Sequence, residues 1–284
     1  VRAVAGELAQ LGIGRLRAGG AGRREPAPGG PTRYEPGGAV GVQLVRGDVS
    51  ATAVGTVTHV EGARVVAFGH PMIGAGQTSL PATLVRVLHI LVSQNRSFKI
   101  SEPTRALGTL VHDRQSSVVV DTSLDAVVVP VRVRVRGVEG APRDEWTFEV
   151  ASHRVLTPVI LAASIQNALK ATVPDAADAM FEATSRVFVE GRTRPEVVGP
   201  SSASAIASLR LFALLEAVYG NSFEVARPSR IEVDVDVRFG RETLEIVDAS
   251  VPSDEVDPGS TVPVRVVMRR WGQPGETVRI VPVR

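Results

Sequence analysis

The 284-residue sequence contains no cysteine. This absence excludes disulfide bonds, thiolate nucleophiles and cysteine-ligated zinc. Long apolar runs are missing too, since none approaches the roughly 20 residues that a membrane-spanning helix needs. We therefore expect no transmembrane segment in this sequence.

Lysine is almost absent, because only Lys99 and Lys170 among the 32 basic residues are lysines. The others are arginines, which stay protonated at ordinary pH and explain a pI near 9.5 at a formal net charge of +2. These arginines are spread along the chain with acids between them, whereas nucleic-acid-binding proteins gather their basic residues on one face or helix. We expect no nucleic-acid partner.

The length and composition predict a globular protein with an atypical beginning. Hydrophobic residues make up 44% and charged residues 22%, and the chain is long enough for one large or two ordinary domains. Residues 1–38 are predicted to form an N-terminal arm and linker, because glycine and proline recur throughout 19–38. We expect any export signal to precede Val1 and the strand pattern to continue beyond Arg284.

Residues 39–175 are predicted to form a β-rich domain, since valine-rich segments of strand length alternate there with turn sequences such as "EGA". The stretch "LPATLVRVLHILV" has apolar residues at helical as well as strand spacing, so a helix over Leu80–Val92 is an alternative to a strand. The predicted fold class is mainly β with a few helices.

The remaining sequence predicts a mixed segment followed by further strands. Pro158 and Pro174 bracket one helical pattern. A second helix is predicted near residues 201–219, where Ser201, Ser202 or Ser204 can cap its start and Gly220 can end it. We assign 176–228 to a mixed α+β segment and 229–284 to a truncated β-sandwich. Alternating apolar residues from Ile231 to Val237 predict a half-buried antiparallel strand.

The titratable residues indicate no metal or cofactor site. None of the histidine pairs has the i, i+4 spacing of a zinc peptidase, and we expect neither a metal nor a cofactor. The glycines of "MIGAGQTS" lack the lysine of a phosphate-binding loop and are interpreted as flexible turns. Arg132, Arg134 and Arg136 share one face of a strand, which is either a stripe for an anionic ligand or, as we favour, a solvated face over buried valines.

His70 stands out because of its setting in "VVAFGHPMIGAG". A buried strand leads to it, Gly69 permits unusual backbone dihedrals, and Pro71 fixes the next φ. A rigid turn of this kind can hold an imidazole at the edge of a cleft, as a general base requires. The alternative is a histidine that merely ends a strand.

The segment from Pro36 to Met72 resembles the core of the SpoIVB peptidase family, exported serine peptidases of bacteria. The likeness is carried by "GTVT" at 55–58 and "FGHP" at 68–71, is extended by "SFKI" and "GTLVHDRQSS", and covers roughly residues 36–175. Membership implies a chymotrypsin-like β-barrel with His70 as the catalytic base.

The other parts of such a site do not carry over from the resemblance. The family's nucleophile lies in a Gly-Met-Ser-Gly-Ser-Pro turn, which this sequence lacks. By order along the chain Ser164 is the weak candidate nucleophile, although its helical surroundings predict a hydroxyl that bonds back to a carbonyl. Asp113 is a weak candidate to orient His70, with a surface ion pair with Arg114 as the alternative. Other candidate nucleophiles are Ser79, Ser116 and Ser117.

Two hypotheses follow from the sequence. In the first, the chain is a degenerate peptidase-like domain, a pseudoenzyme that acts as a binding or structural module of an exported or cell-envelope assembly. In the second, it is an active serine endopeptidase with a rearranged site that uses His70. We expect protein partners or self-association, because edge strands and a terminal arm can add to neighbouring chains.

Overall fold

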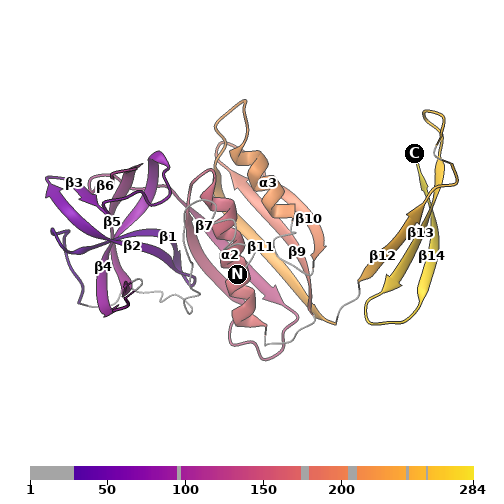
Figure 1. Ribbon diagram of the computed structural model, residues 1–284, viewed down its shortest axis with the longest axis horizontal. Helices are drawn as coiled ribbons and strands as arrows, with labels where there is room; N and C mark the ends of the chain where they lie inside the picture. Colours follow the sequence, from indigo (N-terminus) through magenta and orange to yellow (C-terminus); the bar gives the residue numbers. More distant parts are fainter. Residues whose placement is uncertain (1–28, 95–96, 174–178, 204–209, 241–242, 254) are drawn as a thin grey trace. The chain divides into compact units, whose positions relative to one another are not determined.

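The computed structural model describes residues 29–94, 97–173, 179–203, 210–240, 243–253 and 255–284. As predicted, the protein is mainly β, with 55% of residues in strands and 11% in helices (Figure 1). The chain forms two compact units, with unit 1 ending at Val237 and unit 2 formed by 176–180 and 238–284. Most of the predicted N-terminal arm, residues 1–28, lies outside the described residues.

Unit 1 contains a single sheet of eleven strands. The strands are β1 (Ala39–Gly47), β2 (Ala51–Glu61), β3 (Arg64–Ala67), β4 (Gly76–Leu91), β5 (Phe98–Arg114), β6 (Ser117–Asp121), β7 (Val128–Arg136), β8 (Glu145–Ala151), β9 (Ala179–Val189), β10 (Glu196–Ala203) and β11 (Pro228–Phe239). Their order across the sheet is β10-β9-β11-β7-β8-β1-β2-β3-β6-β5-β4.

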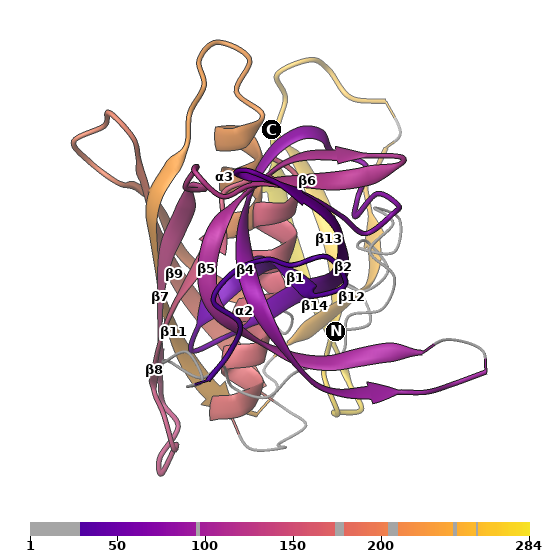
Figure 2. The ribbon, with the colours of Figure 1, turned by 90° about the vertical axis from the view of Figure 1, so that its left-hand side faces the viewer.

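Strands β1 to β6 close into a barrel (Figure 2). Closure occurs because β1 pairs with β4, with Val40 opposite Leu84 and Val42 opposite Ala82, in addition to its pairing with β2. The interior is filled by aliphatic side chains, among them Val40, Val42, Leu80, Leu84, Leu110, Val118 and Val120. Because the barrel is closed, each of its six strands has a neighbouring strand on both sides.

The alternative of a helix over Leu80–Val92 is wrong, since Leu80–Leu91 belongs to β4. This strand pairs with β5 along its length and with β1 near its middle. From Leu80 to Val85 every residue is buried, because both faces of the strand are covered there. An unbroken buried run gives no alternation, which explains why the sequence pattern was ambiguous.

Strands β7 to β11 extend the sheet beyond the barrel and carry two helices, α2 (Leu156–Thr172) and α3 (Arg210–Tyr219). Helix α2 packs on β7, β8 and β1, and α3 packs on α2 and β10 (Figure 1). The buried residues of this layer include the valines of β7 from Val129 to Val135 and the alternate residues Ile231 to Val237 of β11. The half-buried character of β11 is therefore confirmed.

The sequence predicted an antiparallel strand here, and the parallel pairing of β11 with β7 was not predicted. On its other side β11 lies next to β9 in antiparallel sense, since the Glu190 N–H donates to the Arg227 carbonyl and the Ser229 hydroxyl donates to the Phe188 carbonyl. Ile231 lies opposite Val131 and Val235 opposite Val135. Parallel neighbours need a long crossover, and the chain supplies one through β8, α2, β9, β10 and α3. Strand β11 belongs to unit 1 as far as Val237, after which unit 2 begins; the sequence analysis placed a boundary at residue 229.

The arginine face of β7 is a solvated face of ion pairs, as favoured from the sequence. Arg132 contacts Glu232 at 3.0 Å, Arg134 contacts Glu145 at 2.9 Å, and Arg136 contacts Asp236 at 2.9 Å. Because each guanidinium already has a carboxylate, these arginines do not form a free stripe for an anionic ligand.

The first helix matches its predicted position, whereas the second begins later than predicted. Residues 201–203 end strand β10, 204–209 lie outside the described residues, and α3 starts at Arg210. Its end at Gly220 is as predicted, since the Gly220 N–H donates to the Glu216 carbonyl at 2.8 Å. Neither described helix combines the length and apolar character needed to cross a bilayer.

Unit 2 contains a three-stranded antiparallel sheet with strands β12 (Leu244–Ser250), β13 (Val262–Arg270) and β14 (Glu276–Val283). Strands were predicted in this region, and the turn between β13 and β14 falls in "WGQPGE". Among the described residues of these three strands, only Val267 is a buried apolar residue, so this sheet has very little core of its own.

Candidate functional site

His70 lies in the turn after β3, where the backbone takes an uncommon conformation. Phe68 has φ +75° and Gly69 has φ +72°, both in the left-handed region. A bulky residue adopts this region rarely and only where its surroundings hold it there. The Phe68 N–H donates to the Thr56 carbonyl at 3.0 Å, which ties the turn to β2.

The two segments that carry the family resemblance meet at Gly55 and Phe68. A Cβ atom on Gly55 would lie 1.8 Å from the nearest ring carbon of Phe68, so the ring fills the space that a side chain on residue 55 would occupy. The same ring lies 5.7 Å from the imidazole of His70, centroid to centroid. The glycine in "GTVT" thus allows the packing that supports "FGHP".

The imidazole of His70 is exposed, and one of its nitrogens is bound locally. Its Nδ1 lies 2.7 Å from the carbonyl oxygen of Pro71. A carbonyl can only accept, so Nδ1 carries the proton of the neutral ring and Nε2 is left as the acceptor. No hydroxyl among the described residues is hydrogen bonded to His70. The imidazole therefore has the tautomer that a general base needs, but no hydroxyl of the described residues donates a hydrogen bond to its Nε2.

Asp113 is buried, with 1% of its surface exposed, and it binds backbone rather than a side chain. Its Oδ1 accepts the N–H of Met72 at 2.6 Å, and its Oδ2 accepts those of Ile73 at 2.8 Å and Ala75 at 3.2 Å. These bonds fix the turn that follows His70 to the end of β5. Asp113 therefore has neither of the expected arrangements, a bond to the imidazole or an ion pair with Arg114.

The turn bound by Asp113 is the glycine-rich segment interpreted from the sequence as flexible. Gly74 and Gly76 have φ +70° and +68°, which lets successive N–H groups point toward one carboxylate. These amides follow His70 closely in the chain, and an oxyanion hole needs free amides near the base. Because they already bind Asp113, they cannot also stabilise a reacting oxyanion without breaking those bonds.

Ser164 is buried in helix α2, and its hydroxyl donates to the Ile160 carbonyl at 2.8 Å, as its helical surroundings predicted. Among the other candidate nucleophiles, Ser79 is exposed on β4, and Ser116 and Ser117 lie at the turn from β5 to β6. Only Ser116 of these borders the neighbourhood of His70. It lines an open depression together with Pro71, Gly74, Gly76, Asp113, Arg114 and Gln115.

His153 has a structural role that the sequence did not indicate. Its Nδ1 accepts the N–H groups of Val155 and Leu156, both at 3.2 Å, at the start of α2. Burial, with a smaller contribution from the charge of Arg154, lowers the pKa of His153. Both effects favour the neutral ring, whose Nδ1 lone pair those amides require. The clue in the sequence is its place directly before a helical pattern.

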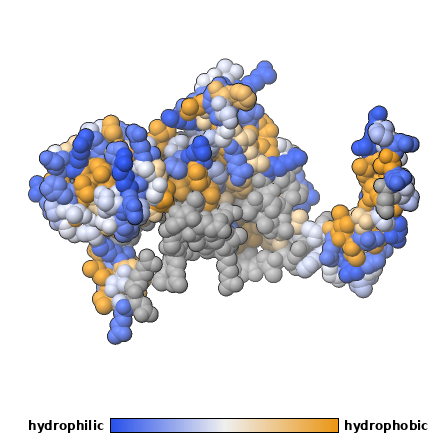
Figure 3. Space-filling model, turned by 45° about the horizontal axis from the view of Figure 1, so that its top comes forward, coloured by the Kyte–Doolittle hydropathy of each residue, from blue (hydrophilic) through white to orange (hydrophobic). Residues whose placement is uncertain are grey.

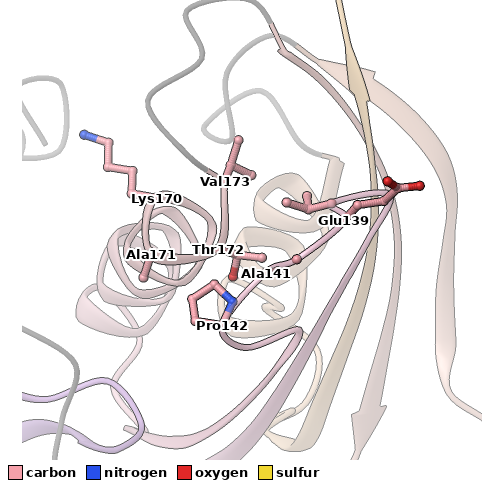
Figure 4. A pocket seen from close by; sticks show the side chains of 9 residues that line it. Glu139, Ala141, Pro142, Lys170, Ala171, Thr172 and Val173 are labelled. Atoms are coloured by element: carbon pink, nitrogen blue, oxygen red, sulfur yellow. The ribbon is translucent and has the colours of Figure 1, made fainter.

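A second cavity, of about 270 Å³, lies between the turn from β7 to β8 and the end of α2 (Figure 4). Its charged residues, Glu139 and Lys170, extend away from its centre, whereas Ala141, Pro142 and Thr172 face it. Thr172 accepts a hydrogen bond from the indole N–H of Trp146 at 2.9 Å. The groups that face the centre of this cavity are small, and the one hydroxyl among them, that of Thr172, is already bonded to Trp146 and to the Ala168 carbonyl.

The described residues contain no group of three or more histidines, aspartates and glutamates placed to hold a metal ion. Comparisons with known protein families, with curated proteins and with solved structures find no match to this chain.

Proposed function

We propose that unit 1 contains a divergent SpoIVB-peptidase-like barrel that lacks peptidase activity and serves as a binding or structural module in an exported or envelope assembly of a bacterium. The closed barrel of β1 to β6 and the contact between Gly55 and Phe68 support the resemblance. A chymotrypsin-like barrel is the corresponding proposal for its fold.

The proposed loss of activity is based on the hydrogen bonds that His70 and the turn after it already make. The imidazole has its hydrogen bond with Pro71, and the following amides bind Asp113. Hydrolysis of an amide requires an activated nucleophile and a stabilised oxyanion together. The residues around His70 supply neither of these two requirements.

An assay of peptide hydrolysis tests this proposal. Purified protein is incubated with casein and with a mixture of fluorogenic peptides, and His70→Ala and Ser164→Ala variants serve as controls. We expect the same background rate for all three proteins. A rate that is well above background in the natural sequence and is lost in His70→Ala would overturn the proposal.

A second candidate function, an active endopeptidase with a rearranged site, is favoured by one observation. Ser116 lines the same open depression as Pro71, so a hydroxyl and the His70 turn border one space. In this candidate His70 is the base and Ser116 the nucleophile. It requires that Ser116→Ala abolish hydrolysis as fully as His70→Ala does, while Ser117→Ala leaves the rate unchanged.

A further inference from the structure

The hairpin formed by β4 and β5 extends beyond the barrel as an arm (Figure 2). We define the hairpin arm as residues 87–94 and 97–101, the described positions beyond the ion pair between Arg86 and Glu102. These positions pair with each other across the hairpin, whereas the pairing of β4 with β1 is confined to Ala82–Leu84. Among the described strands, none pairs with the arm from outside, so it is a two-stranded extension.

Both faces of the hairpin arm carry exposed apolar side chains. Because residues opposite each other in an antiparallel pair share a face, His89, Leu91, Phe98 and Ile100 lie on one face, and Val87 and Ile90 lie on the other. Six aliphatic residues of the arm are well exposed: Val87, Leu88, Ile90, Leu91, Val92 and Ile100. Apolar surface is visible on this projection at the lower left of Figure 3.

The charge of the arm has one sign. Between Arg86 and Glu102 the sequence contains Lys99, Arg96 and His89 but no acid. The ammonium group of Lys99 donates to the Thr56 hydroxyl at 2.6 Å and has no carboxylate partner among the described residues. A partner of the arm therefore has to accept apolar side chains and complement positive charge.

We propose that the hairpin arm binds the surface of a membrane that contains anionic phospholipids. Lipid can cover both apolar faces, whereas a protein groove against one face leaves the other in water. Anionic head groups complement Lys99, and basic residues beside apolar ones are a common basis of interfacial binding. A second copy of the arm is a poorer partner, because it would place one acid-free basic segment against another.

The arm lies within the interfacial layer, where lipid contacts both of its faces, and its tip does not cross the hydrocarbon core. The described tip residues Ser93, Gln94 and Ser97 are polar, and polar groups are costly in the hydrocarbon core. At about 3.3 Å per residue, Val87–Leu91 spans roughly half of the ~30 Å core, so the arm cannot cross it. Lys99 can keep its ammonium group at the head groups while its methylene chain contacts lipid.

Co-sedimentation of the full chain with vesicles tests the proposal. Vesicles of phosphatidylcholine alone are compared with vesicles of phosphatidylcholine and phosphatidylglycerol. We expect the protein to pellet with the anionic vesicles and much less with the neutral ones. An Ile90→Ser/Val92→Ser variant should bind the anionic vesicles about tenfold more weakly, because two exposed aliphatic side chains no longer enter the interface.

The matched control is Phe223→Ser/Val225→Ser in the loop after α3. These side chains are 98% and 85% exposed, so this variant removes a similar exposed apolar surface from another part of unit 1. It should bind as the natural sequence does, and circular dichroism and thermal unfolding should show that both double variants are folded.

A charge test separates the two components of binding. Lys99→Gln should weaken binding to anionic vesicles by about fivefold without changing the weak binding to neutral ones. Thr56→Ala removes the same hydrogen bond but keeps the charge, so it should bind normally.

A fluorescence test reports directly on contact between the arm and lipid. Because the chain has no cysteine, a single Val92→Cys can carry an environment-sensitive dye, whose emission should rise and shift to the blue on binding. The same dye on Phe223→Cys should not respond.

The proposal is wrong if the natural protein stays in the supernatant with anionic vesicles, or if the Ile90→Ser/Val92→Ser variant binds as well as its control. If the protein does not bind vesicles but forms an oligomer that the same double substitution dissociates, a second copy covers the arm instead. The peptidase assay is independent of the arm, so each proposal can fail without the other.

Discussion

The carboxylate of Asp113 accepts the backbone N–H of Met72 at 2.6 Å and thereby ties the end of β5 to the turn that follows His70. The sequence separation between the two residues is 41, so this bond connects two strands rather than two neighbours. The geometry of the candidate site therefore depends on an acid that does not touch the imidazole.

We predict that Asp113→Asn lowers the free energy of unfolding by about 2–3 kcal/mol. An amide offers one acceptor oxygen, and its NH2 group would face N–H donors of the turn, which leaves buried groups unpaired. Urea denaturation measures the change. Asp125→Asn, at an exposed position, is the control and should stay within about 0.5 kcal/mol of the natural sequence. Equal midpoints for the two variants would contradict the assigned role of Asp113.

A second prediction concerns the contact between Gly55 and Phe68. Gly55→Ala should destabilise the protein by about 1–3 kcal/mol, since the added methyl group overlaps the Phe68 ring. The cost should fall sharply in a Phe68→Ala background, where that ring is gone, and a double-mutant cycle measures this coupling. Gly199→Ala, which adds a methyl group in open space on β10, should cost little. Additive effects of Gly55→Ala and Phe68→Ala would show that the ring does not fill the space beside Gly55.

A third prediction is a loss of stability in acid caused by His153. Its folded pKa lies below that of the unfolded chain because burial disfavours the charged ring. The unfolded state therefore binds the proton first, and the contribution of His153 is complete above its ordinary pKa of about 6.5 and lost as pH falls from there toward the folded value.

Denaturation midpoints at neutral and mildly acidic pH measure this effect. His153→Asn keeps an oxygen acceptor for the first amides of α2 but does not titrate, and Asn is a favoured residue at helix starts. The variant should lose less stability between the two pH values than the natural sequence does. The other four histidines are unchanged, so they contribute equally to both proteins. An identical loss in both would exclude His153 as the cause.

Periodicity in the sequence was sufficient for most strands and for one helix, because alternating valines report a half-buried face directly. It could not identify neighbours, so the parallel pairing of β11 with β7 was not expected. It also failed where both faces are buried, as from Leu80 to Val85, since no alternation remains there.

At the candidate site, the sequence identified His70 and its rigid turn but not what surrounds them. Gly55 and Phe68 were noted as parts of motifs, yet their contact depends on the pairing of β2 with β3. The role of Asp113 requires a turn about 40 residues away to fold back onto β5. A pattern of residue types carries no information about such long-range hydrogen bonds.

The central claim is that no hydroxyl in this protein is activated by His70. Incubation with a fluorophosphonate probe, which labels activated serines covalently, followed by intact mass spectrometry, tests this claim most directly. We predict an unmodified mass under conditions that fully label a control serine peptidase. A stoichiometric adduct that disappears in His70→Ala, and maps to Ser116 or another serine, would contradict the account and identify an active peptidase.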